Sequence, residues 1–150
     1  MRIEEAIKQK KPFDNAKGRA QVNLIYTHNW LVHRIKQGLK PYGLTMNQFN
    51  VLRILRGAGE PITTSVIRER LLDKMADASR LVDRLHQKGW VLRKVCPTDK
   101  RLVDVSLSEE GHQLLTELDA VRERMTTHFN NLTEKEAEQL NDLLDKVRSR

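Results

Sequence analysis

The chain lacks most features that mark secreted, metal-bound or membrane-embedded proteins. It contains one cysteine, Cys96, which excludes an intrachain disulfide and a cysteine-rich zinc site. No run approaches the roughly 20 apolar residues that a membrane-spanning helix needs, and residues 1–14 carry charges where a secretory signal would be apolar. The sequence therefore predicts a cytoplasmic protein with no membrane partner.

Aromatic residues are also scarce, at 5% of 150 residues, so leucine, isoleucine and valine must supply most of the core. The length suits a single domain over residues 1–150. There is no glycine-rich phosphate loop, nucleophile elbow or paired metal motif, so we expect neither an enzyme nor a cofactor. The five histidines are scattered, and His28 and His33 lie about 140° apart around a helix, so no metal site is expected.

Positive charge is what the sequence has in excess. Its net charge is +7, from 27 Lys and Arg against 20 Asp and Glu. Residues 62–106 carry ten cations against six anions, whereas residues 107–150 carry six against ten. A polyanion such as nucleic acid would bind the basic part. From charge alone, a nucleic-acid partner and the simpler interpretation, a soluble basic protein, are equally favoured.

Apolar residues recur at helical spacing near both ends of the chain. One stripe, from Leu24 to Leu39, belongs to a predicted helix that begins near Asp14 or Ala16 and stops at Gly43. A second begins after the N-cap Ser108 and continues to Phe129, and a capping box at Thr133 opens a last helix. A partner subunit would cover the surplus apolar surface of these helices. The expected homodimer interface contains Leu24, Leu118, Val121, Met125, Leu140 and Leu144.

Three shorter helices are predicted in the middle of the chain. Thr45 and Gln48 form a capping box before the first, and Thr63 or Thr64 can cap the second. The third spans about residues 75–88. Its polar face, opposite the apolar one, holds Ala76, Arg80, Asp83, Arg84 and Gln87.

Two alternating runs, residues 90–95 and 102–107, follow these helices and indicate a β-hairpin with its turn at Cys96–Arg101. The sequence thus predicts a mostly α fold with a small β-hairpin wing. Its parts are a winged helix-turn-helix DNA-binding domain at 44–107, with the wing at 90–107, and dimerisation helices at 14–43 and 108–150.

This arrangement suits double-stranded DNA, because a major groove admits one α-helix and a hairpin beside it can reach the narrow minor groove, where an arginine fits. We expect Arg101 to be that arginine. Asp99 either orients its guanidinium or simply forms the turn. The expected DNA-contacting residues are Arg101, Asp99, Lys100, Arg80, Ser79, Ala76, Asp77, Lys74, Arg84 and Lys94.

Several of these residues have a structural alternative. Asp77 could accept from a cytosine amino group, but capping the helix is favoured. Arg84 could instead form a charge pair with Asp83. Arg93 and Lys94 alternate along a strand, so only one of them is expected to face DNA. Lysines such as Lys74 and Lys100 suit phosphate contacts, which set affinity and not sequence preference.

The motifs resemble those of the MarR family of regulators. Asp99-Lys100-Arg101, then Leu107-Ser108 and Gly111, matches the family signature D-x-R-x(5)-[LI]-[ST]-x-x-G. The resemblance implies a homodimeric, sequence-specific transcription factor, usually a repressor, on a pseudo-palindromic operator. It also implies that a small phenolic or lipophilic effector releases the DNA. The alternative is a constitutive or architectural DNA-binding protein without an effector.

The resemblance also suggests where an effector would bind. By family position the pocket would be lined by His28, Trp30, Met46, Phe49 and Arg53, although core packing explains the apolar three equally well. His28 lies on an apolar stripe and is expected to be a buried core histidine. Cys96 could sense oxidants from the wing base, but a bystander thiol is the default, because the family's sensing cysteine lies near the first helix.

Overall fold

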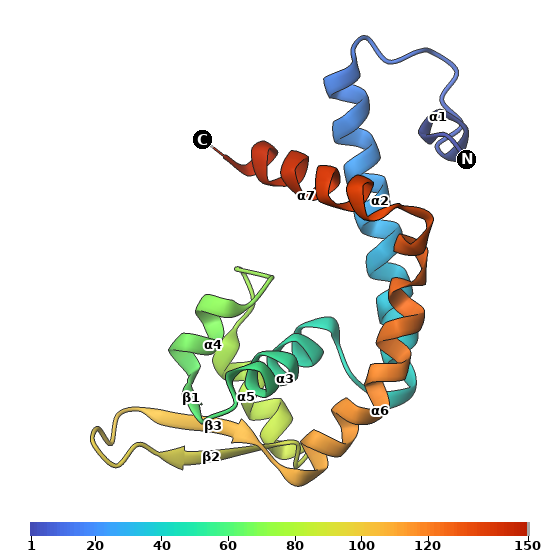
Figure 1. Ribbon diagram of the computed structural model, residues 1–150. Helices are drawn as coiled ribbons and strands as arrows, with labels where there is room; N and C mark the ends of the chain where they lie inside the picture. Colours follow the sequence, from blue (N-terminus) through green and yellow to red (C-terminus); the bar gives the residue numbers. More distant parts are fainter. Residues whose placement is uncertain (150) are drawn as a thin grey trace.

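The computed structural model describes residues 1–149, so the last residue of the predicted domain, Arg150, lies outside them (Figure 1). The structure is mostly helical with a small antiparallel sheet, as predicted. In chain order, the elements are α1 (Ile3–Ala6), α2 (Ala16–Leu39), the 3-10 turn η1 (Lys40–Tyr42), α3 (Met46–Ala58), β1 (Ile62–Thr63), α4 (Thr64–Arg70), α5 (Ala78–Gln87), β2 (Val91–Val95), β3 (Val103–Leu107), α6 (Glu109–Thr126), the 3-10 turn η2 (Thr127–Asn131) and α7 (Glu134–Arg148).

Side-chain caps fix where most helices begin. The Thr45 hydroxyl accepts from the Gln48 amide (3.1 Å) while the Gln48 side chain accepts from the Thr45 amide (3.1 Å), so the predicted capping box is confirmed. Thr63, not Thr64, caps α4. The long helix α2 ends at Leu39, earlier than predicted, because Pro41 disfavours continued α-helix. The chain then turns at Gly43, whose φ of 64° suits glycine.

The sheet joins the helix-turn-helix to the wing. Its strand order is β1-β3-β2, and both pairs are antiparallel, with Val91 opposite Leu107 and Ile62 opposite Val105. Val91 and Val105 are fully buried against the helical core, whereas the outer part of β2 is exposed. The wing is therefore anchored at its base and projects at its tip, as Figure 1 shows.

Helix α6 links the winged domain to the long helix α2. A bidentate ion pair joins Arg56 of α3 to Asp119 of α6 (2.9 and 3.0 Å), and the Arg56 hydrogen bonds lower the pKa of the Asp119 carboxyl. At Gly38 of α2, an added Cβ would lie 2.9 Å from Cε of Met125, so the two helices approach closely there.

Three predicted interface residues are corrected by this packing. Leu118, Val121 and Met125 are buried in the chain's own core, because α6 turns that stripe toward α2 and the winged domain. Phe129 lies in η2 and not in the long helix, since α6 ends at Thr126. The other predicted interface residues lie on other helices. Of these, Leu24 on α2 and Leu140 on α7 are exposed.

The terminal helices stand away from the winged domain (Figure 1). Within Glu134–Arg148 no residue is buried, and the apolar side chains Leu143 and Val147 are 61% and 72% exposed, whereas Leu144 is half-buried. The first half of α2 is uncovered as well, with Leu24 and Ile25 exposed. No helix in residues 1–149 combines the length and the apolar character that crossing a membrane requires.

Candidate nucleic-acid interface

The wing tip holds one arginine in a fixed direction. The Arg101 guanidinium donates from Nε to Oδ1 of Asp99 and from Nη2 to Oδ2, each over 3.1 Å, and the Arg101 amide also donates to Oδ1. The predicted pair is confirmed. These hydrogen bonds lower the pKa of the Asp99 carboxyl. The Arg101 side chain is nevertheless 89% exposed, so it points into solvent with its base anchored.

The turn itself is closed by backbone hydrogen bonds. The Leu102 amide donates to the Asp99 carbonyl and the Cys96 amide to the Leu102 carbonyl, each over 2.9 Å. Lys100 lies exposed at the tip beside Arg101, in a position to meet a phosphate. The wing therefore presents two adjacent cations on a hydrogen-bonded loop.

The recognition helix α5 begins three residues later than predicted. The Asp77 carboxylate accepts from the Arg80 amide (3.0 Å) and so caps the helix at Ala78, which supports the favoured alternative for Asp77. Ala76 precedes the helix and packs partly against the core, so its predicted place on the outer helical face is wrong. Ser79 and Arg80 are exposed in the first turn.

The charges beside α5 are arranged differently from the prediction. Asp83 pairs with Arg93 of β2, not with its neighbour Arg84, and this ion pair ties the wing to the recognition helix. Among residues 1–149, Arg84 has no ion-pair partner and lies exposed. Lys94 is exposed on the strand opposite Asp104. Of the two strand cations, Lys94 is therefore the one left available to a phosphate.

The loop before α5 contains features that the sequence pattern did not reveal. Asp73 accepts from the Asn47 amide group and from the Met75 backbone amide, both over 3.0 Å, and the Asn47 bond lowers the pKa of Asp73. Lys74 donates to the Glu69 carbonyl (2.6 Å). Met75 is 93% exposed beside the recognition helix, where an apolar side chain could touch a thymine methyl group. No spacing pattern in the sequence singles out Met75, which stands between Lys74 and Ala76.

The five predicted effector residues lie on two helices, α2 and α3. His28 is exposed on α2, so the expected buried histidine is wrong for this chain. Trp30, also on α2, stacks edge-on against the His128 ring at 4.9 Å. On α3, Phe49 belongs to the core, Met46 packs against that core, and the Arg53 guanidinium lies 5.8 Å from the Phe49 ring.

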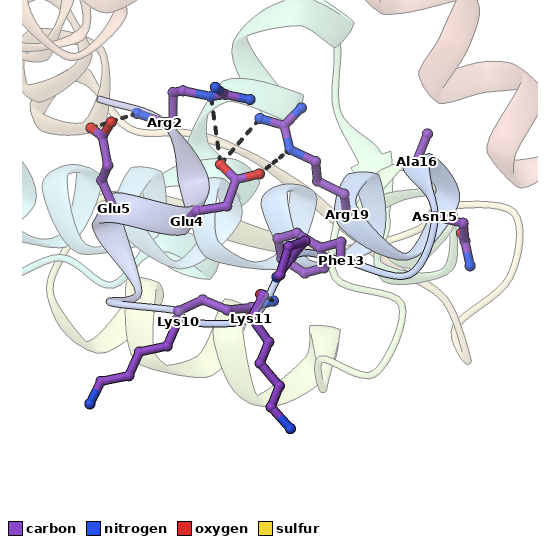
Figure 2. A pocket seen from close by; sticks show the side chains of 11 residues that line it. Arg2, Glu4, Glu5, Lys10, Lys11, Phe13, Asn15, Ala16 and Arg19 are labelled. Carbon is purple, nitrogen blue, oxygen red and sulfur yellow. Dashed lines mark hydrogen bonds and ion pairs between the residues drawn. The ribbon is translucent and has the colours of Figure 1, made fainter.

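Two cavities are found elsewhere in residues 1–149, and neither is lined by those five residues. The first, of about 490 Å³, is an open hollow at the N-terminal segment and the start of α2. Figure 2 shows its Glu4–Arg19 ion pair, with Nε and Oε1 2.6 Å apart, and Lys10 and Lys11 projecting outward. The second, of about 310 Å³, lies between α2 and α6.

Cys96 sits at the wing base, half-buried, with Sγ 3.2 Å from the Thr98 hydroxyl. Hydrogen bonding by Thr98 lowers the pKa of the Cys96 thiol. In residues 1–149 no three His, Cys, Asp or Glu side chains gather as metal ligands would.

The fold and the basic, projecting wing define a winged helix-turn-helix DNA-binding protein. A family model described as the MarR family matches residues 42–102. The multiple antibiotic resistance protein MarR of Salmonella typhimurium is 34% identical over 128 residues, which are 83% of this chain and 88% of that protein. The HTH-type transcriptional repressor IacR of Pseudomonas putida is 30% identical over 129 residues, 85% of this chain and 74% of IacR.

A solved structure shares the fold. It is the structure of BpsR from Bordetella bronchiseptica, whose DNA binding is regulated by 6-hydroxynicotinic acid. It has a TM-score of 0.73 and 24% identity, covering 87% of this chain and 99% of BpsR. The chain belongs to the MarR family. It is therefore a transcription regulator and not an enzyme.

Proposed function

We propose that the protein is a homodimeric repressor that binds a pseudo-palindromic operator and is released by a small-molecule effector. The single observation that carries the DNA-binding part is the fixed, solvent-directed Arg101 at the wing tip. An arginine held in this way loses little conformational freedom when it enters a minor groove. The recognition helix supplies Ser79, Arg80 and Arg84 to the major groove, and lysines such as Lys74, Lys94 and Lys100 bind phosphates.

Uncovered apolar surface supports the homodimer. Leu143 and Val147 of α7, together with Leu24 and Ile25 of α2, expose side chains that water solvates poorly. These residues lie on the terminal helices, away from the wing (Figure 1). A second copy that covers them leaves both recognition helices free, and two such helices about 34 Å apart read successive major grooves.

Repression and effector release are supported by the relatives. IacR is named a repressor, and BpsR is described as regulated by 6-hydroxynicotinic acid. The cavity between α2 and α6 offers a place for a small molecule next to the winged domain. The rival function, a constitutive or architectural DNA-binding protein, has no use for such a cavity.

The first experiment is binding of the purified protein to the DNA upstream of its own gene. It is titrated by fluorescence anisotropy against a scrambled duplex at fixed salt, and light scattering gives the oligomeric state. We expect a dimer and a preference of at least about a hundredfold, within the range of specific regulators. Equal, weak binding to both duplexes would favour the architectural function.

A further inference from the structure

Two large apolar side chains stand in solvent on the loop between α4 and α5. Leu72 is 82% exposed and Met75 is 93% exposed, and Met75 lies just ahead of Asp77, the N-cap of the recognition helix. Figure 1 shows this loop projecting from the helical part of the winged domain. The residues at the start of a recognition helix lie against base edges in the major groove. Met75 is therefore placed where bound DNA would cover it.

Hydrogen bonds to α3 hold the backbone of this loop. The Leu72 amide donates to Oδ1 of Asn50, and Nδ2 of Asn47 donates to Oδ2 of Asp73, each over 3.0 Å. The other carboxylate oxygen of Asp73 accepts from the Met75 amide, also over 3.0 Å. Because its own backbone is fixed before DNA arrives, the Met75 side chain loses less conformational freedom on binding than one on an unrestrained loop.

The polar side chains next to Met75 are already engaged. Asp73 and Asp77 both accept from backbone amides. Lys74 donates from Nζ to the Glu69 carbonyl over 2.6 Å and keeps two further donors for a phosphate. The remaining exposed side chain of this described stretch is the thioether of Met75, which is at most a weak hydrogen-bond acceptor. At this point of the interface the protein therefore offers a base mainly apolar contact.

A thymine carries the group that fits such a side chain. In the major groove it presents a C5-methyl group, which cytosine lacks, and apolar side chains contact that methyl. Methionine is unbranched and polarizable, so it adapts its shape to a small apolar neighbour. A carboxylate or an amide in this place would select a base by hydrogen bonding, whereas Met75 selects by burial of a methyl group.

We propose that Met75 contacts the C5-methyl group of a thymine in each operator half-site and is a specificity-determining residue of this regulator. The inference rests on the proposed function, since it names a base feature that the proposed DNA-binding surface selects. Asn47 and Asn50 act as positioning residues, because they hold the loop that carries Met75.

The contact is tested by replacing each thymine of the operator in turn with deoxyuridine, which lacks only the methyl group. Fluorescence anisotropy measures the affinity of the intact protein for each duplex. We expect the loss of at least one methyl group per half-site to weaken wild-type binding about fourfold, as for burial of one methyl-sized group. With Met75→Ala the same change should cost less than about 1.5-fold. An equal cost in both proteins at every thymine would overturn the proposal.

Two variants of the same loop serve as controls. Met75→Leu keeps an apolar side chain and should keep the methyl preference. Leu72→Ala removes the other exposed apolar side chain and should also keep it, and loss of the preference in Leu72→Ala alone would refute the role of Met75. Since both side chains are exposed, urea unfolding should show all three variants as stable as the wild type.

A methyl group on a different base gives an independent check. Cytosine placed at the position that Met75 contacts should gain about fourfold in affinity when it is replaced with 5-methylcytosine, because the methyl group occupies the same place in the groove. No gain for the wild type, or the same gain for Met75→Ala, would overturn the contact.

Operator preference separates this proposal from the proposed function. Affinity for the unmodified operator against a scrambled duplex tests sequence-specific binding without reference to Met75. If the protein prefers no operator, alternating dA·dT and dA·dU duplexes give the same comparison. The wild type should then bind the dA·dT duplex more tightly, and Met75→Ala should bind the two alike. Equal binding of both duplexes by the wild type would overturn the proposal.

Discussion

Replacing Arg101 with alanine should separate DNA binding from folding. The side chain is 89% exposed and its side-chain partner is Asp99, so truncation should change the free energy of unfolding by less than about 0.5 kcal/mol. Operator binding loses a contact between a charged donor and DNA, worth about 1.5–3 kcal/mol, or roughly a 10- to 150-fold loss of affinity. Anisotropy with operator DNA at fixed salt measures the loss.

A second substitution tests whether the direction of Arg101 matters beyond its charge. Asp99→Asn removes one negative charge from the wing, so a pure charge argument predicts tighter DNA binding. The amide cannot accept both guanidinium hydrogen bonds as the carboxylate does, so the orientation argument predicts weaker, less specific binding. Tighter binding by Asp99→Asn, or unchanged affinity in Arg101→Ala, would refute the assignment of a fixed minor-groove arginine.

Three further outcomes follow from the packing and the surface charges. At Gly111 an added Cβ would lie 2.1 Å from the Trp90 carbonyl oxygen, so Gly111→Ala should lower the free energy of unfolding by about 2–3 kcal/mol, measured in urea; unchanged stability would contradict this close approach. Leu143→Asp should convert the dimer to a monomer in light scattering, whereas Asn141→Asp, an exposed polar neighbour, should not; a dimer in both would move the interface elsewhere. The logarithm of affinity should fall linearly with that of salt concentration, and Lys100→Ala should reduce the slope by about one while affecting specific and scrambled DNA alike; an unchanged slope would remove Lys100 from the phosphate contacts.

Local chemistry explains which parts of the fold could be predicted. Thr45, Ser108 and Thr133 each accept from a backbone amide within three residues, so their caps depend only on nearby sequence. The Asp99–Arg101 pair was predictable for the same reason, because both residues belong to one turn. The start of α5 was missed by three residues because helical periodicity alone extends backward past the Asp77 cap.

Contacts between distant segments could not be predicted in this way. Periodicity shows that one face of α6 is buried, but it does not say whether the chain itself or a second copy covers that face. For that reason Leu118 and Val121 were predicted to lie in the dimer interface, although they are buried in the chain's own core. Likewise, the Asp83–Arg93 ion pair needs the hairpin folded against α5, so sequence proximity favoured Arg84 instead.

The acidic residues around the proposed interface resolve an apparent conflict with DNA binding. An unpaired carboxylate near phosphates would weaken DNA binding. Four aspartates here, Asp73, Asp77, Asp83 and Asp99, instead accept hydrogen bonds that fix a neighbouring group. Their partners are the Asn47 amide for Asp73, the α5 amide of Arg80 for Asp77, Arg93 for Asp83 and Arg101 for Asp99. The acids thus hold the loop, the recognition helix and the wing in place, while Arg84, Lys94 and Lys100 supply exposed positive charge. A net charge summed over the sequence misses this division, because it counts an orienting carboxylate as if it only repelled the DNA.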